Sequence, residues 1–469
     1  MYRWRFLPTQ RLLIPCAVLI VAFLGAWWTI SETRASLERE IDAVVVKAME
    51  EGPIAGLSLA VARGGRLVHL KGYGYADLEN RIPASDKTIY HVGSITKQFT
   101  AAAVMQLVEK GVLALDRPIT DYIPDYPTRG NRVTVGSLLN HTSGIKNFTA
   151  MPSWWRTMAV EKTPEEMVDV FRNEPFDFLP GTAFSYSNSG YIVLGFLIEQ
   201  VTGKPYGGYL NENLFVPLQL SSTSYCDDRA LVPQRARGYK LAERSFVNAD
   251  YVSQSQAYAA GAVCSSAQDL VRWMHALAHS EVVSPESYAR MIQPGTLANG
   301  GSVEYGFGLA VSYLEQHHRI NHVGGTLGFA GQICYYYDDD VTIVVLSNTE
   351  GAKVANIESD IARLMLGLGN RTVKDILLAP EELKQYSGVY EVKPGEVEIK
   401  PTKGRLEVDL AIPGVEGRYV LLNQGKNLFH VESDSEISLR FALEEGSAKG
   451  FVLSYKGITM HGTRTRHGS

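Results

Sequence analysis

The chain has 469 residues, of which 45% are hydrophobic and 20% are charged, a composition typical of globular domains with large cores. This length predicts two domains with appendages rather than a single domain. The formal net charge of −5 lacks the basic excess of nucleic-acid-binding domains, so we expect no nucleic-acid partner.

Residues 1–35 are predicted to form a signal anchor or a signal peptide. An arginine-containing start precedes an uncharged stretch of 19 residues from Leu12 to Ile30, which is about long enough to span a bilayer. The arginines should stay cytoplasmic, so the residues after Ile30 should be exported. No A-x-A cleavage site is evident, so we favour a membrane anchor. The rest of the chain would then be periplasmic or extracellular, or secreted if the segment is cleaved.

Three cysteines follow this segment: Cys226, Cys264 and Cys334. An oxidising compartment permits one disulfide among them and leaves one free thiol. The sequence does not identify the pair, and three buried free thiols are the alternative. The cysteines are too scattered for a metal framework, and we predict no metal site and no cofactor.

A helix and a hairpin are expected next. Residues 36–50 have the pattern of an amphipathic helix. Two alternating runs within residues 56–72, joined by two glycines, predict a β-hairpin. A helix that is apolar on nearly every side then runs from Ser94 to a stop signal at Gly111, so we expect it to be buried.

The middle of the chain is predicted to be helical. A capping box opens a helix over residues 163–172, and residues 178–203 read as a turn, a polar loop and an apolar helix. A further helix over residues 265–278 places His275 and His279 four residues apart. This spacing suits a metal ion, but no acidic residue accompanies it, so we interpret the two histidines as part of a partly exposed helix face.

From Tyr305 the pattern changes to strands, and a last helix is expected over residues 352–368. The three aspartates at 338–340 are interpreted as a turn between strands rather than as a cation site. The N- and C-terminal parts of residues 36–370 can share one antiparallel sheet with an all-helical insertion between them. This organisation predicts an α+β fold.

The C-terminal part is compositionally separate. Residues 371–380 are predicted to be a linker, and residues 381–469 contain eight short alternating runs separated by turn residues. Such spacing predicts a small antiparallel β-barrel. No motif in these residues indicates a catalytic or binding site, and the role of the barrel stays open.

Ser94 and Lys97 share one face of the buried helix because they stand three residues apart. A lysine on such a helix is costly unless it is paired or functional, and a neighbouring serine can be a nucleophile that gives it a proton. The spacing arises easily, since Ser143 and Lys146 repeat it in a glycine-containing loop. The α/β-hydrolase elbow G-x-S-x-G is absent from the sequence.

Two further motifs contain candidate catalytic and substrate-binding residues. Tyr186 and Asn188 lie in the polar loop before a helix; a tyrosine near a lysine can have its pKa lowered enough to relay protons, and an asparagine can bind an acyl amide. His322, Gly324 and Gly325 lie on a predicted strand, where paired glycines let a substrate backbone approach closely. The alternative interpretation of the motif around His322 is a β-bulge beside an exposed histidine.

Together and in this order, these motifs resemble the serine β-lactamase-like superfamily, in the branch that holds class C β-lactamases, D-alanyl carboxypeptidases, D-aminopeptidases and family VIII esterases. The resemblance covers residues 54–368 and includes GLSLAVARGGRLVHLKGYGYADLE, HVGSITKQFTAAAVMQLVEKG, VTVGSLLNHTSGI, FSYSNSGYIVLGFLIEQVTG and HVGGTLGFAGQ. It implies the β-lactamase/transpeptidase-like fold. From LKQYSGVYE onward, the C-terminal part also resembles the lipocalin-like barrel of some members.

The resemblance implies a role for each matched residue. Ser94 would be the acylated nucleophile and Lys97 its proton partner. Tyr186 would be the general base for acylation and the relay that passes a proton to the leaving group. Asn188 would orient Lys97 and the substrate amide. The backbone N–H groups of Ser94 and Gly325 would form the oxyanion hole.

The third motif departs from the pattern of class C β-lactamases, which carry a lysine where this chain has His322. A lysine is a fixed cation that holds a substrate carboxylate, whereas a histidine with a pKa near 6.5 is largely neutral at pH 7. The substrate-binding set of His322, Gly324 and Gly325 therefore resembles the peptidase and esterase members more closely.

We therefore expect an exported serine hydrolase that cleaves a small ester, amide or D-amino-acid-containing peptide through a Ser94 acyl-enzyme. One alternative is a non-catalytic envelope protein that binds or senses a ligand on the same fold, and another is a β-lactamase. The expected partners are a small-molecule or peptide substrate and the membrane, through the N-terminal segment. Whether the chain forms a homo-oligomer stays open.

Overall fold

The computed structural model describes residues 35–369, 375–392, 395–412, 415–432, 437–444, 446–455 and 458–467. The predicted membrane anchor lies outside the described residues, as does part of the predicted linker. Residues 35–51 are helical, as expected, and belong to a compact unit that is distinct from Gly52–Ser469. Within the described ranges, no helix is both long enough and apolar enough to cross a membrane.

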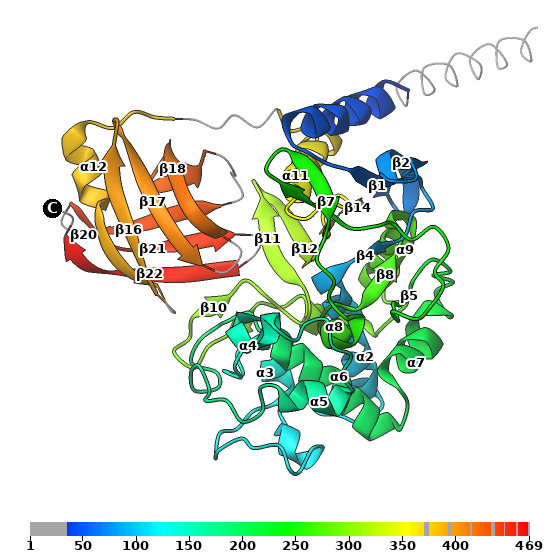
Figure 1. The fold of residues 1–469 in the computed structure, drawn as a ribbon. Helices are drawn as coiled ribbons and strands as arrows, with labels where there is room; N and C mark the ends of the chain where they lie inside the picture. The colour runs from blue at the N-terminus through cyan, green and yellow to red at the C-terminus, as the bar shows by residue number, and fades with distance from the viewer. Residues whose placement is uncertain are drawn as a thin grey trace, which may run out of the picture. The chain divides into compact units, whose positions relative to one another are not determined.

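A seven-stranded antiparallel sheet is the centre of the larger part of the chain (Figure 1). The N-terminal strand β1 pairs along its length with β14, which lies nearly 300 residues later, with Leu57 opposite Ser347. The sequence prediction of one sheet shared by distant parts of the chain is thus confirmed. In sheet order the strands are β11 (Ala310–Leu314), β12 (His317–Thr326), β13 (Phe329–Tyr336), β14 (Val341–Ser347), β1 (Gly56–Arg63), β2 (Arg66–Asp77) and β3 (Ile82–Pro83).

Helices α9 and α11 pack against this sheet, α9 on β1 and β14 and α11 on β13 and β14. Helix α2 is buried along nearly its whole length, as its apolar sequence predicts. Its Phe99 ring packs on Trp273 of α9, with ring centroids 4.1 Å apart. The helices are α2 (Thr96–Glu109), α3 (Val135–Leu139), α4 (Pro152–Trp155), α5 (Pro164–Asp169), α6 (Asn188–Thr202), α7 (Tyr206–Leu210), α8 (Gln254–Gly261), α9 (Ala267–Ala278), α10 (Pro285–Met291), α11 (Val354–Met365) and α12 (Pro380–Tyr386).

Eight antiparallel strands form a closed barrel in the C-terminal part (Figure 1). Its interior is aromatic, with Tyr390, Phe441 and Phe451 in mutual edge-to-face contact. The predicted α+β fold with an added small barrel is therefore confirmed. The barrel strands are β15 (Gly388–Val392), β16 (Gly395–Thr402), β17 (Arg405–Ile412), β18 (Val415–Gly425), β19 (Leu428–Val431), β20 (Ser438–Glu444), β21 (Ser447–Tyr455) and β22 (Ile458–His467).

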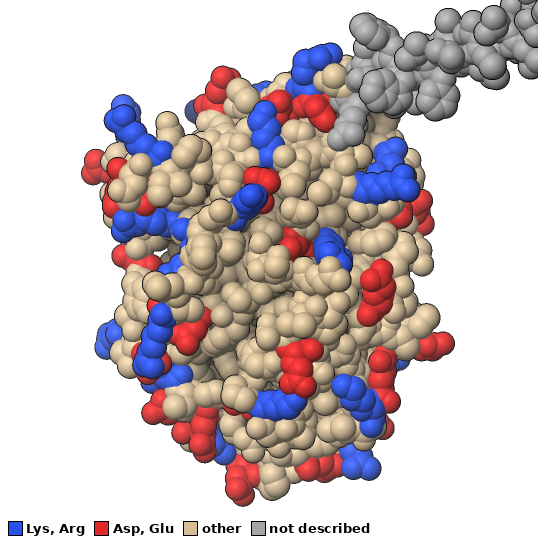
Figure 2. Space-filling view, turned by 90° about the vertical axis from the view of Figure 1, so that its right-hand side faces the viewer, with Lys and Arg blue, Asp and Glu red and all other residues tan. Residues whose placement is uncertain are grey.

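Charged side chains of both signs are interspersed on the face shown in Figure 2. Many of the described exposed charges lie in ion pairs such as Lys146–Asp177 and Arg237–Glu79. Such pairs at the surface add little to stability, typically less than about 1 kcal/mol each. This face offers a mixed surface rather than the basic stripe that tracks a nucleic-acid backbone.

Candidate active site

Ser94 lies in a short 3₁₀ turn, η1 (Gly93–Ile95), directly before helix α2. Gly93 enters this turn with a φ of +53°, a conformation that a residue with a side chain rarely adopts. The turn brings the Ser94 Oγ within 3.1 Å of the Lys97 Nζ. The predicted pairing of these two side chains on one face is therefore present.

The Lys97 ammonium position is fully buried and surrounded by oxygen atoms. Besides the Ser94 Oγ, the Nζ contacts the Asn188 Oδ1 at 2.8 Å and the Ala260 carbonyl at 2.9 Å. Burial holds the pKa of Lys97 well below its usual value, because a charged amine loses its hydration there. A neutral amine can donate to the two acceptors and still accept the Ser94 proton, which is the arrangement a general base needs.

The Ala260 carbonyl reaches Lys97 because helix α8 is broken at Tyr258, whose φ of +39° and ψ of −132° are not helical. The break leaves two consecutive carbonyls turned toward α2: that of Ala259 accepts from the Thr100 hydroxyl, and that of Ala260 accepts from Lys97. Backbone strain of this kind collects at functional sites. No local sequence motif predicts this contact.

Hydrogen bonds fix both the side chain and the backbone of Asn188, the first residue of α6. Its Nδ2 donates to the Thr149 hydroxyl at 3.2 Å, and its backbone N–H donates to the Asn147 Oδ1 at 3.1 Å. Since the amide nitrogen is bound to Thr149, the amide oxygen must face Lys97. The expected orientation of Lys97 by Asn188 matches this geometry.

The Tyr186 ring lies under the Lys97 Nζ, with 4.8 Å between the nitrogen and the ring centroid. Its hydroxyl oxygen is buried and forms no hydrogen bond of standard geometry with a described residue, although the nearby Ser94 opposes the rise of its pKa. Burial is the larger effect and raises the pKa of Tyr186. The sequence analysis expected the lysine to lower this pKa, so the direction of the shift differs from the expectation.

His322 is buried rather than exposed, and both of its ring nitrogens are engaged. Its Nδ1 donates to the Val323 carbonyl at 2.7 Å, so its Nε2 accepts the Tyr305 hydroxyl proton at 2.8 Å. Burial, with the Lys97 charge as a second cause, lowers the pKa of His322 to about 3. The imidazole is therefore neutral at pH 7, as the sequence analysis expected, and has no free donor for a substrate carboxylate.

His141 is a second buried histidine at the site, and the sequence analysis did not single it out. Its Nδ1 accepts the backbone N–H of Ser187 at 3.1 Å, and its ring packs at a tilt against Tyr186, with ring centroids 4.3 Å apart. Burial keeps the pKa of His141 well below its usual value. A neutral ring of this kind holds the loop that carries Tyr186 and Asn188.

The two glycines of β12 have different surroundings. A Cβ on Gly324 would meet the Val92 carbonyl at 2.0 Å, so this glycine is needed for packing against the start of the nucleophile turn. A Cβ on Gly325 would meet nothing within 4 Å, and this residue is exposed. The Gly325 nitrogen lies only 2.8 Å from where a Gly93 Cβ would be, which brings the peptides of Gly325 and Ser94 together at the open side of the site.

The second serine–lysine match has no such surroundings. Lys146 forms an ion pair with Asp177 at 2.8 Å, and the Ser143 Oγ accepts from the backbone N–H of Ile145. Identical spacing thus gives a site only where a helix buries the lysine.

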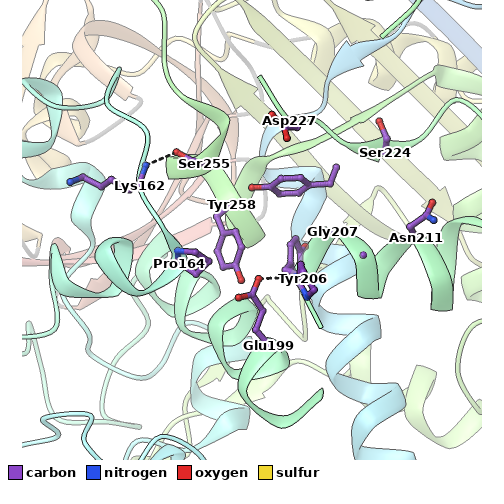
Figure 3. A pocket seen from close by; sticks show the side chains of 13 residues that line it. Lys162, Pro164, Glu199, Tyr206, Gly207, Asn211, Ser224, Asp227, Ser255 and Tyr258 are labelled. Carbon is purple, nitrogen blue, oxygen red and sulfur yellow. Dashed lines mark hydrogen bonds between the residues drawn. The ribbon is translucent and has the colours of Figure 1, made fainter. Parts of the chain in front are cut away.

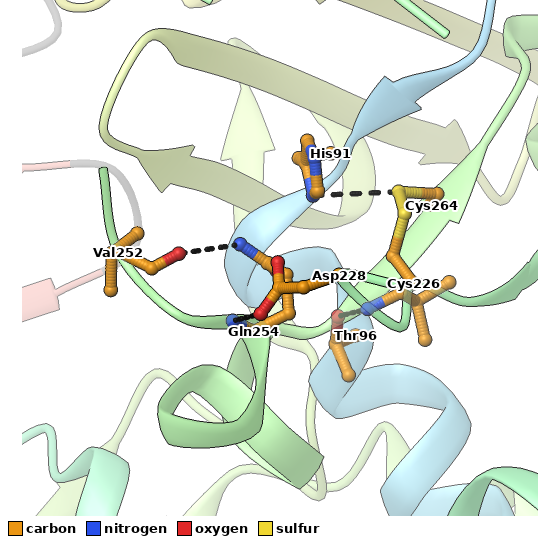
Figure 4. Close-up of a disulfide and its surroundings, with 8 residues drawn as sticks. His91, Thr96, Cys226, Asp228, Val252, Gln254 and Cys264 are labelled. Atoms are coloured by element: carbon orange, nitrogen blue, oxygen red, sulfur yellow. Dashed lines mark hydrogen bonds between the residues drawn. A yellow bond between two sulfur atoms is a disulfide. The ribbon is translucent and has the colours of Figure 1, made fainter. Parts of the chain in front are cut away.

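A disulfide joins Cys226 and Cys264 (Figure 4). Cys334 is a buried free thiol. Cys264 lies on β8 (Val263–Ser265), which pairs with β4 (Tyr90–His91) just before the nucleophile turn. The backbone N–H of Val263 also donates to the Thr96 hydroxyl at 3.0 Å. The disulfide therefore holds a strand that packs directly on the start of α2.

Two cavities adjoin this region. One of 490 Å³, a size typical of ligand pockets, continues from the Gly325 end of β12, with Thr326, Leu327, Arg235 and Asp228 among its lining residues. The other, of 610 Å³, lies around Tyr258 (Figure 3). None of the predicted site residues lines either cavity. The first cavity is lined by His91 and Thr326, which lie close in sequence to Ser94 and Gly325.

The antiparallel sheet, the helical insertion and the buried serine–lysine pair are the features of a serine hydrolase of the β-lactamase fold. The family model described as Beta-lactamase matches residues 41–365, so the chain belongs to the β-lactamase family. Penicillin-binding protein 4* of Bacillus subtilis (strain 168) is 26% identical over 440 residues, which cover 87% of this chain and 95% of that protein.

Solved structures extend the comparison. A D-amino acid amidase from Ochrobactrum anthropi SV3, complexed with D-phenylalanine, is similar with a TM-score of 0.63 and 26% identity, covering 71% of this chain and 99% of that one. An octameric penicillin-binding protein homologue from Pyrococcus abyssi has a TM-score of 0.66 at 24% identity and covers 90% of this chain and 99% of that one. This second likeness concerns the fold, and its coverage extends into the C-terminal barrel.

Proposed function

We propose that the protein is an exported serine hydrolase that cleaves a small ester, amide or D-amino-acid-containing peptide through a Ser94 acyl-enzyme. The observation that carries the proposal is the contact of 3.1 Å between the Ser94 Oγ and the Nζ of a fully buried Lys97. The similarity to a D-amino acid amidase supports the substrate class. The Cys226–Cys264 disulfide supports export, because disulfides persist in oxidising compartments.

In the proposed acylation step, the Ser94 Oγ attacks the substrate carbonyl carbon and gives its proton to the neutral amine of Lys97. The backbone N–H groups of Ser94 and Gly325 donate to the oxyanion; loss of one such donor typically costs about 3–4 kcal/mol of transition-state stabilisation. The two peptides are close enough to act together, since Gly93 packs against Gly325.

The leaving group needs a proton, and Tyr186 is the proposed donor. A phenol whose pKa is raised by burial is a poor base at rest but keeps its proton for donation. Lys97 then returns the Ser94 proton to the phenolate. In this proposal Lys97 is the resting base. The family resemblance implied Tyr186 for that role instead. Water replaces the leaving group in deacylation, and the proton movements reverse.

His322, Gly324 and Gly325 complete the proposed substrate strand. His322 positions the strand as a neutral group through Tyr305 and Val323, Gly324 lets the strand approach Val92, and Gly325 faces the substrate. The absence of a fixed cation at 322 weighs against the β-lactamase alternative, since a neutral imidazole gives no strong attraction for a carboxylate.

A fluorophosphonate probe tests the proposal, with peptide mass spectrometry to locate the label. We expect labelling at Ser94 in the folded protein and none in Ser94→Ala. If a folded sample is not labelled, the assignment of Ser94 as the nucleophile is wrong. Labelling without turnover of D-amino-acid amides, short-chain esters or muropeptides would favour the ligand-binding alternative, and rapid nitrocefin hydrolysis would favour a β-lactamase. Whether the chain forms a homo-oligomer stays open.

A further inference from the structure

At one end of the strands of the central sheet, the end of helix α9 meets the turn between β13 and β14. His275 lies in the last turn of α9, His279 is the C-cap of that helix, and Asp340 belongs to the β13–β14 turn. One ligand atom from each of these three residues lies within 4.8 Å of the other two. The sequence analysis set the histidines aside because no acidic partner accompanied them, and the fold supplies one from more than 60 residues away.

We propose that His275, His279 and Asp340 bind a divalent transition-metal ion, with Zn²⁺ as the favoured ion. Two imidazoles and one carboxylate, completed by water, are a ligand set that zinc uses with four-coordinate geometry. Histidines at i and i+4 on a helix present their rings on one side and bind one ion together. Zn–N distances of about 2.1 Å place tetrahedral ligands roughly 3.4 Å apart.

The distances are close to this requirement. The His279 Nε2 lies 3.8 Å from the Asp340 Oδ2, and the ring centroids of His275 and His279 are 4.0 Å apart. The three ligand atoms, now within 4.8 Å of one another, reach ligand spacing by side-chain rotations that bring them to about 3.4 Å. His279 and Asp340 are about 40% exposed, so water can reach the remaining coordination positions.

Neighbouring groups orient the ligands as metal sites require. The His279 Nδ1 donates to the His275 carbonyl at 2.9 Å, which fixes the tautomer and leaves the Nε2 lone pair free, as is usual for a zinc-bound histidine. The Tyr335 hydroxyl donates to the Asp340 Oδ1 at 3.2 Å, which leaves the Oδ2 toward His279. The buried Nδ1 of His275 has no hydrogen-bond partner among the described residues.

Two backbone features support a cation here. The last turn of a helix carries partial negative charge from its unpaired carbonyls, which favours a bound cation. The β1–β2 turn leaves room for the rings, because a Cβ on Gly65 would lie 2.7 Å from the His275 ring. The backbone N–H of Gly64 donates to the Asp340 carbonyl at 2.9 Å and holds the two turns together. An ion at this point would join α9 to both turns.

Metal titration of the untagged, disulfide-intact protein tests the proposal, with Co²⁺ as a spectroscopic probe and Zn²⁺ as its competitor. We expect one Co²⁺ per chain with the visible absorption of a four-coordinate site, and stoichiometric displacement by Zn²⁺. His279→Asn and Asp340→Asn should each weaken binding by more than the roughly 10–100-fold typical of losing an outer partner. Hydrogen exchange should show Zn²⁺-dependent protection at the end of α9 and in the β13–β14 turn.

The chain offers a matched control at the same turn. His317 and Asp339 form another histidine–carboxylate pair, at 2.6 Å, but among the described residues no third ligand group lies close enough to complete a set of three. The double variant His317→Asn, Asp339→Asn should bind Co²⁺ as the unaltered protein does. Absence of binding, equal loss in the control, or full binding in both ligand variants would overturn the proposal. None of these outcomes depends on catalysis, so the test is independent of the proposed hydrolase function.

Discussion

Replacing Asn188 with aspartate tests whether Lys97 acts as the resting base. The Asn188 Oδ1 lies 2.8 Å from the Lys97 Nζ, so Asn188→Asp puts a carboxylate at this contact with almost no change of shape. The Thr149 hydroxyl accepts from the Asn188 Nδ2 and donates to the Asn147 Oδ1, and it can rotate to donate to the new oxygen instead. The substitution therefore changes mainly the charge beside the amine.

The size of the effect follows from the geometry. Two opposite unit charges about 4 Å apart interact by about 4 kcal/mol at an effective dielectric constant near 20, which corresponds to a rise of about 3 units in the pKa of Lys97. Burial lowers this pKa in the unaltered protein. Since the base must be neutral, acylation rises with pH through the pKa of Lys97, and the variant should need a pH about 3 units higher.

The assay is the second-order rate constant of fluorophosphonate labelling between about pH 5 and pH 10. At neutral pH, Asn188→Asp should be slower by up to about 10³-fold and should recover at alkaline pH. Asn188→Leu is the matched control, because it loses the same hydrogen bond without adding a charge and should show no alkaline shift. If the Asn188→Asp profile keeps the position of the unaltered protein, Lys97 is not the base and the argument from burial is wrong.

Three further predictions follow from the site and its surroundings. Tyr186→Phe should slow amide turnover by about 10²–10⁴-fold but leave the pH-dependent rise of fluorophosphonate labelling in place, because fluoride leaves without a proton; equal loss in both assays would remove the donor role. His322→Lys should raise nitrocefin turnover relative to ester turnover, measured as the ratio of kcat/KM values, and an unchanged ratio would show that charge at this position does not select carboxylates. Replacing both Cys226 and Cys264 with serine should lower the free energy of unfolding by about 4 kcal/mol, since the disulfide closes a loop of 38 residues; denaturant unfolding measures this, with Cys334→Ser as the disulfide-intact control.

Periodicity and turn residues were sufficient to predict most of the fold. The alternating runs of the C-terminal part correspond to the eight barrel strands, and the apolar run after Ser94 corresponds to the buried helix α2. The helical insertion and the shared sheet followed from the order of elements along the chain. These features depend on local patterns of burial, which a single sequence carries.

The contacts that tune the site could not be predicted in this way. Tyr305 and His322 are 17 residues apart on neighbouring segments, and the Ala260 carbonyl reaches Lys97 across 163 residues. No local pattern encodes such pairs, because their distance depends on how the sheet and α8 are assembled. His141 was within reach of sequence reasoning, since it lies in the matched stretch VTVGSLLNHTSGI, but its burial decides its role. The same limit explains why His275 and His279 lacked a visible partner before the fold brought Asp340 to them.

The charge of the site bears on which substrates the protein is expected to accept. Lys97 is neutral when it acts as a base, and its nitrogen is already bound to three oxygens. His322 is neutral because burial lowers its pKa to about 3, and both of its nitrogens are engaged. A substrate carboxylate next to the scissile bond would therefore lose its hydration without gaining an ion pair. Burying an unpaired charge in this way costs free energy.

The cavity beyond Gly325 is different, because Arg235 and Asp228 both line it and give it charges of either sign. A substrate that carries its ionised groups a few bonds away from the reacting carbonyl can place them there. On the proposed function, we therefore expect the protein to prefer neutral acyl groups at Ser94 and to distinguish substrates by the charge of their distal end. Paired D-amino-acid amides that differ only in a distal charged group would measure this preference as a ratio of kcat/KM values, and a ratio near one would refute it.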